Sequence, residues 1–239
     1  MSYADRHKAK YAGQVTARPV LVAGAAKVKP SAPAAAIDPR IAQYMAGLDA
    51  DLLRLKQLQR PEREQLKFNE LLPRYLPLIN ELVRADHKQD CIAAGRIAFY
   101  CMVWSLDIRD WSGAIYLCDK VLNPWGISSF DDFSRTPANI VAGQMASWCN
   151  EQHSDFGGLS AEPVLSLLVE FAGRHARTLL EPIMADIAKA QGGEAELKNN
   201  PIAALEHYRQ ALSFNSASGV KRLINRLQKG LAAQSQSPL

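Results

Sequence analysis

The sequence lacks the motifs that mark the common enzyme classes. It contains no GxxxxGK[ST] phosphate loop, no HExxH zinc motif and no GxSxG nucleophile turn. These absences exclude ATP binding by a phosphate loop, and they exclude metalloprotease and hydrolase chemistry of the familiar types. We therefore expect no cofactor and no catalytic centre recognisable from a motif.

Cysteine is also scarce, and its spacing is uninformative. Cys91, Cys101, Cys118 and Cys149 form no CxxC pair, and no histidine lies at metal-ligand spacing beside one of them. A disulfide framework or a zinc site is therefore not expected. We predict that the four residues are small buried hydrophobic side chains in a reducing cytoplasm.

No apolar run approaches the roughly 20 residues that cross a bilayer. The start of the chain, MSYADRHKAKYAG, has no apolar core of the kind found in secretion signals. We therefore expect no membrane partner. The formal net charge of +4 permits an anionic partner but does not demand one.

Strand-like alternation is missing as well, whereas apolar residues recur at steps of three and four. We therefore predict an all-α fold, with a helical hairpin or long helices, a compact helical core and a flexible basic N-terminal tail. The expected parts are a tail over 1–37, a helical domain over 38–152 and a C-terminal helical region over 153–239. The internal boundary is placed at the polar, glycine-bearing segment 153–158.

The first helix is expected to start at Asp38, a good N-cap that is followed by Pro39. Pro61 should interrupt it, and Pro73 and Pro77 should kink or split the next helix. The leucine stripe of these helices must pack on something. An intramolecular partner and a second copy of the chain are both open.

The later helices are expected over 89–106, 110–122, 137–152, 201–213 and 219–232, and residues 160–191 are expected to form one or two helices. Thr136 is the predicted cap before Pro137. Pro182 should bend its helix, and Gly192–Gly193 should end it.

Basic residues gather at the two ends of the chain. The tail has Asp5 as its only acid, and its Ala- and Pro-rich composition is typical of a linker or of an arm that lies along phosphates. The last helix has a basic patch with no acid nearby, which fits contact with nucleic acid, contact with an acidic protein surface, or simply the preference of a helix C-terminus for cations. The cations around Pro61, among them Lys67, are diluted by Asp51 and nearby glutamates and indicate a solvated face. The predicted DNA-binding residues are Arg6, His7, Lys8, Lys10, Arg18, Lys27, Lys29, Lys221, Arg222 and Arg226, with Lys229 beside the last three.

A metal-dependent nuclease needs several carboxylates that converge on its ions. Asp107 with Asp110, and Asp131 with Asp132, are the local acidic pairs, and both fit helix caps and loops better. The alternative hypothesis is nevertheless an intrinsic Mg²⁺-dependent nuclease that uses Asp107, Asp110 or the Asp131–Asp132 pair. A helical scaffold without a DNA role is a third.

Several segments of residues 1–152 resemble the small terminase subunits of temperate tailed phages, which are commonly described as terminase endonuclease subunits. The most specific of them is the block MVWSLDIRDWSGAIYLCDKVL, with Met102-Val103-Trp104, Asp107, Asp110-Trp111 and Gly113-Ala114. The other segments are DRHKAK, LKQLQRPEREQLKFNELLPRYLPLINEL and DDFSRTPANIVAGQMA.

The resemblance implies a DNA-packaging role in the host bacterial cytoplasm. Such a subunit binds double-stranded viral DNA and recruits the large ATPase subunit, with which it cuts and packages the genome. It also implies a homo-oligomer, in the form of a ring. Because no catalytic cluster is evident, we expect the cutting to reside in the large subunit.

Overall fold

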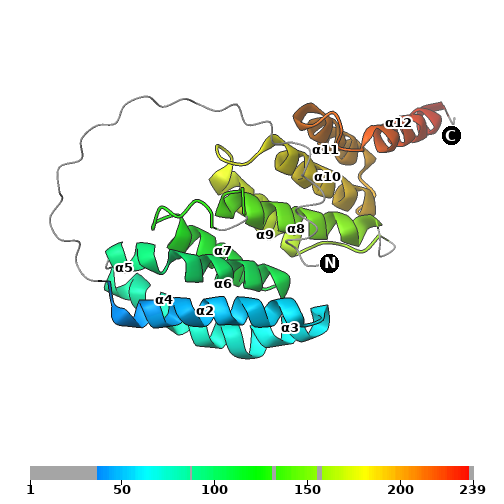
Figure 1. Ribbon diagram of the computed structural model, residues 1–239. Coiled ribbons are helices and arrows are strands. Elements are labelled where there is room, and N and C mark those ends of the chain that lie inside the picture. The colour runs from blue at the N-terminus through cyan, green and yellow to red at the C-terminus, as the bar shows by residue number, and fades with distance from the viewer. Residues whose placement is uncertain (1–36, 87, 131–132, 155–157, 237–239) are drawn as a thin grey trace, which may run out of the picture. The chain divides into compact units, whose positions relative to one another are not determined.

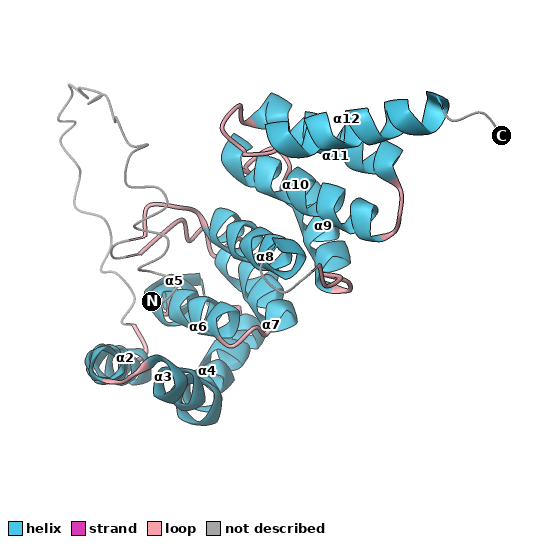
Figure 2. Ribbon diagram, turned by 90° about the vertical axis from the view of Figure 1, so that its right-hand side faces the viewer, coloured by secondary structure: helices cyan, strands magenta, loops and turns pink. Residues whose placement is uncertain are grey.

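The computed structural model describes residues 37–86, 88–130, 133–154 and 158–236, with side chains described up to 233. Every regular element in these ranges is a helix (Figure 1 and Figure 2), which confirms the all-α prediction. By their contacts these residues form two compact units. One runs to Asp110 and includes Pro124–Gly126, and the other comprises Trp111–Asn123 and the residues from Ile127 onward. The division at residue 153 remains a prediction.

Among the described residues, none of the helices combines the length and the apolar character that crossing a membrane would require.

The first unit is a set of antiparallel helices joined by short breaks. Its elements are α2 (Pro39–Gln57), α3 (Arg60–Leu66), the π-helix η1 (Lys67–Leu71), α4 (Leu72–Ala85), α5 (Lys88–Ala93) and α6 (Gly95–Asp107).

The N-terminus of α2 is fixed by the predicted cap. The Asp38 carboxylate accepts a hydrogen bond from the Arg40 N–H at 2.8 Å, and Pro39 occupies the first turn. The leucine stripe that follows is buried within the chain, with Ile41, Leu48 and Leu55 at most 6% exposed. The sequence left open whether this stripe packs within the chain or against a second copy, and the structure shows that it packs within the chain.

The helical segment that follows α2, from α3 through η1 to α4, changes helix type next to a proline. Pro73 has no N–H, and its ring crowds the carbonyl one turn before it. The chain responds with the π-helix η1, in which the Leu72 N–H bonds to the Lys67 carbonyl five residues back. The segment therefore continues through Pro73 and Pro77 to Ala85.

The face around Pro61 is less solvated than we expected. Lys67 and Asp107 form a buried ion pair at 2.6 Å, with side chains 8% and 14% exposed. Asp51 is buried too, and it accepts hydrogen bonds from Tyr75 Oη at 2.8 Å and Arg74 Nη1 at 2.7 Å. The prediction of a solvated face was wrong for Asp51 and Lys67, because both have partners more than 20 residues away in sequence.

The second unit is built from helices that pack through small residues. Its elements are α7 (Trp111–Tyr116), the π-helix η2 (Leu117–Leu122), α8 (Pro137–Ser154), α9 (Val164–His175), α10 (Glu181–Leu197), α11 (Pro201–Phe214) and α12 (Lys221–Gln236).

All four cysteines are buried and carry free thiols, as predicted. Burial raises the pKa of Cys118 and of Cys149 to about 12. These thiols are therefore protonated at neutral pH and behave as small apolar side chains.

Two predictions about α10 were wrong. Pro182 lies in the first turn and begins the helix instead of bending it, and the helix continues through Gly192 and Gly193 to Leu197. A Cβ on Gly192 would lie 2.5 Å from Tyr208 Cε1, and one on Gly193 would lie 2.5 Å from His153 Nδ1. The glycines therefore serve close packing of α11 and α8 against α10.

We expect Gly192→Ala to lower the free energy of unfolding by roughly 1–3 kcal/mol, because the added methyl group overlaps the buried Tyr208 ring. Chemical denaturation of the full chain measures this change.

The matched control is Gly173→Ala in α9, where the added Cβ meets no atom within 4 Å. Because alanine favours a helix over glycine, this variant should gain roughly 0.5–1 kcal/mol. Equal effects of the two substitutions would contradict the packing argument.

Candidate nucleic-acid interface and the polar network behind it

Helix α12 has one apolar side and one basic side. Its apolar residues recur at steps of three and four and pack against a buried cluster that includes Ala204, Tyr208 and Val220. The apolar residues are Leu223, Ile224, Leu227 and Leu231.

The opposite side of α12 exposes four cations, which we call the basic face. No acidic residue lies between 219 and 236, so no charge on the helix offsets them. Cations so close together, fixed on a helix that is anchored by its other side, can contact successive phosphates of a nucleic acid. The basic face consists of Lys221, Arg222, Arg226 and Lys229.

One member of the basic face also holds the helix in place. Arg226 forms an ion pair with Glu196 of α10, which also accepts a hydrogen bond from Tyr208 Oη at 2.6 Å. The other three cations form no ion pair with any described residue. Charge for a polyanion therefore comes mainly from Lys221, Arg222 and Lys229.

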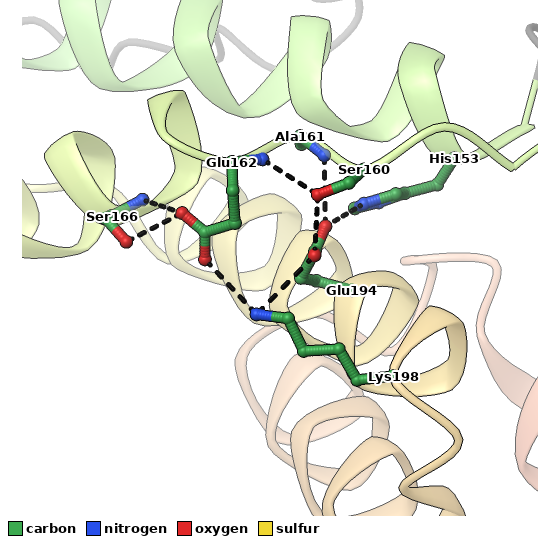
Figure 3. Close-up of polar contacts among 7 residues, drawn as sticks. All are labelled: His153, Ser160, Ala161, Glu162, Ser166, Glu194 and Lys198. Carbon is green, nitrogen blue, oxygen red and sulfur yellow. Dashed lines mark hydrogen bonds and ion pairs between the residues drawn. The ribbon is translucent and has the colours of Figure 1, made fainter.

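A second carboxylate on α10, that of Glu194, is buried and has several partners (Figure 3). It accepts hydrogen bonds from Ser160 Oγ at 2.8 Å and from the Ala161 N–H at 3.0 Å, and it lies 3.1 Å from His153 Nε2. Lys198 Nζ lies 3.5 Å away. These contacts join three parts of the chain to one another: the end of α8, the segment that precedes α9, and α10 itself.

The pKa of Glu194 reflects this network. Burial alone would raise the pKa of the carboxyl group, but the hydrogen bonds from Ala161, Ser160 and His153 together outweigh burial and lower it. The carboxylate is thus charged at neutral pH.

The network extends to the exposed start of α9. Glu162 accepts a hydrogen bond from Ser166 Oγ at 2.7 Å, and Lys198 Nζ lies 3.5 Å from its carboxylate (Figure 3). A groove beside these residues is lined by acids together with Lys198, Asn200 and His207. Its mixed charge suits a framework of ion pairs better than a site for a polyanion.

The structure places the predicted site residues unevenly. Lys221, Arg222 and Arg226 lie together on the basic face, whereas the predicted tail residues Arg6, His7, Lys8, Lys10, Arg18, Lys27 and Lys29 lie outside the described residues. Their contacts with DNA stay predictions.

The nuclease candidates do not form a cluster within the described residues. Asp107 is occupied by its ion pair with Lys67, and Asp110 is exposed just before α7. Neither belongs to a described group of three potential metal ligands. Asp131 and Asp132 lie outside the described residues.

One group of potential ligands was missed from the sequence. Cys118, Asp119 and His175 bring a thiol, a carboxylate and an imidazole within 4.8 Å of one another. The histidine is 56 residues from its carboxylate partner. No local motif spans that distance, so only the folded chain reveals the group.

Comparison with known proteins identifies the family. Residues 45–200 match the family model described as phage small terminase subunit. The chain belongs to the phage small terminase subunit family. Its membership gives it a role in phage DNA packaging.

Two curated relatives agree with this family. The chain is 27% identical over 190 residues to the "Terminase, endonuclease subunit" of Escherichia phage P2, covering 79% of this chain and 73% of the relative. It is 25% identical over 192 residues to the "Probable terminase, endonuclease subunit" of Haemophilus phage HP1, covering 74% of this chain and 65% of the relative. No solved structure matches the chain.

We expect Glu194→Gln to lower the free energy of unfolding by roughly 1–3 kcal/mol at neutral pH, because the charge-assisted hydrogen bonds are lost. Since folding lowers the pKa of this carboxyl group, its contribution is present above the unfolded pKa near 4.5 and is lost as the pH falls through the folded value. The difference from the unmodified chain should therefore shrink in acid. Urea unfolding across a pH series measures it.

Glu206→Gln, on the exposed side of α11, provides the control and should change stability little at any pH. A Glu194→Gln effect that stays constant into acid would contradict the assigned role of the charge.

Proposed function

We propose that the chain binds double-stranded viral DNA through its phosphates and presents it to the large ATPase-nuclease subunit in the host cytoplasm. The observation that carries the proposal is the basic face of α12, with three cations free of ion pairs with any described residue. The basic residues of the N-terminal segment 1–37 would add further phosphate contacts. No base-reading motif supports specific recognition by this helix alone.

Self-association as a ring is part of the proposal. The leucine stripe of α2 and α4 cannot supply the contact, because the chain buries it internally. The interface would have to use other surfaces, which include exposed apolar side chains such as Leu53 and Phe68, 61% and 64% exposed.

Cutting of DNA by this chain itself is the competing function, and the names of the two relatives favour it. Such an activity would need Mg²⁺ and would be lost on Asp107→Ala or Asp110→Ala. The ion pair between Asp107 and Lys67 argues instead for a structural carboxylate, so we assign the cutting to the large subunit.

The test is the salt dependence of duplex binding by the full chain. A variant in which Lys221, Arg222 and Lys229 are all replaced by Gln should bind more weakly at low salt. The slope of log affinity against log salt should become shallower by roughly 2–3, because each lost phosphate contact removes about 0.9 of slope. Fluorescence anisotropy with a labelled duplex gives both values.

The matched control replaces Lys56, Arg84 and Lys88 by Gln, which removes the same charge from exposed positions of α2, α4 and α5. This control should keep the slope of the unmodified chain. An equal loss in both variants would show that net charge matters and the basic face of α12 does not.

A further inference from the structure

The group formed by Cys118, Asp119 and His175 takes no part in the basic face of α12 or in the Glu194 network. Cys118 and Asp119 are adjacent in the π-helix η2, and His175 is the last residue of α9. The thiol is fully buried, and the side chains of Asp119 and His175 are 16% and 15% exposed. The group is thus largely enclosed, with limited solvent access at Asp119 and His175.

The two oxygens of Asp119 have different partners. Oδ1 lies 2.6 Å from His175 Nε2, whereas Oδ2 accepts a hydrogen bond from Arg174 Nε at 3.1 Å and lies 3.0 Å from Nη2 of the same guanidinium. On the other side, the amide of Asn123 lies 3.8 Å from Cys118 Sγ. Each of the three residues therefore contributes one potential metal-ligand atom, and the three atoms lie within 4.8 Å of one another.

We propose that Cys118, Asp119 and His175 bind one divalent ion of the zinc class, with a water molecule in the fourth position. Sulfur, imidazole nitrogen and carboxylate oxygen are the ligands that Zn²⁺ takes in proteins, in tetrahedral geometry. The inference is independent of DNA binding.

The geometry is close to what such an ion requires. Ligand atoms around tetrahedral Zn²⁺ lie about 3.3–3.6 Å apart, given metal–ligand distances of about 2.0–2.3 Å. The nitrogen and oxygen at 2.6 Å must separate by less than about 1 Å to reach that spacing. The sulfur, which lies within 4.8 Å of both, must approach them by up to about 1.5 Å.

The surrounding residues suit an outer shell. Arg174 would orient the carboxylate through its second oxygen, and the Asn123 amide would donate toward the sulfur. Arg174 is itself paired with Glu170 at 2.7 Å. With the ion bound, the thiolate, the two carboxylates, the guanidinium and the dication sum to zero charge.

The protons also balance. Binding displaces the thiol proton to solvent, and the proton that His175 Nε2 shares with Asp119 also leaves that nitrogen, so that Nε2 ligates while the imidazole keeps a proton on Nδ1. A coordinating metal ion supplies the positive charge that deprotonates such a thiol.

Titration of the metal-free, untagged full chain with Co²⁺ tests the proposal. Tetrahedral thiolate coordination should give a sulfur-to-cobalt charge-transfer band at one equivalent, and Zn²⁺ should abolish the band by displacement. Cys118→Ser should remove the band. His175→Gln should weaken Zn²⁺ affinity by at least roughly a hundredfold, since even an outer-shell change costs about 10–100-fold.

Cys149→Ser is the matched control, because it removes another buried thiol that lies outside the group. It should keep both the band and the affinity. Asp119→Asn provides a second test should Cys118→Ser fail to fold, and it should weaken Zn²⁺ binding as His175→Gln does.

Absence of a thiolate band in the folded, unmodified chain would overturn the proposal. So would a band that survives in folded Cys118→Ser, or Zn²⁺ affinity that is unchanged in both His175→Gln and Asp119→Asn. In each case the group would be an ion-paired contact that fastens α9 to η2 without a metal.

Discussion

The arrangement of the C-terminal helices depends on the buried carboxylate of Glu194. A charge removed from water is tolerated only when hydrogen bonds replace its hydration, and here the Ser160 hydroxyl, the Ala161 N–H and the His153 imidazole do so. These partners come from the end of α8 and the segment before α9. The requirement to satisfy one charge thus fixes three stretches of chain together.

Two residues further along α10, Glu196 contacts the helices that follow α10 and, among the described residues, not those that precede it. It joins Tyr208 of α11 and Arg226 of α12, so that the helix bearing the basic face is tied to the same frame. The close approach that makes these contacts possible rests on Gly192, which admits the Tyr208 ring against the backbone of α10. Packing around α10 therefore positions the basic face of α12, although the cations of that face are themselves exposed.

Local features were predictable because they need only neighbouring residues. The Asp38–Pro39 start of α2, the break at Pro61, the burial of the cysteines and the two-sided pattern of α12 all followed from spacing and residue type. The prediction for the glycine pair in α10 was wrong, because glycine occurs both at helix ends and where two helices pack closely, and the sequence does not distinguish the two cases. The choice depends on whether a ring lies opposite, which spacing cannot show.

The sequence by itself determined that the chain is helical, where most helices begin, and that its last helix is basic on one side. Those properties follow from backbone propensity and from the period of the apolar residues. Tertiary structure alone decided that Lys67 pairs with Asp107 and that His175 meets Cys118 and Asp119. The physical reason is that electrostatic contacts depend on distance in space, and these side chains become neighbours only when helices 40 or more residues apart in sequence pack together.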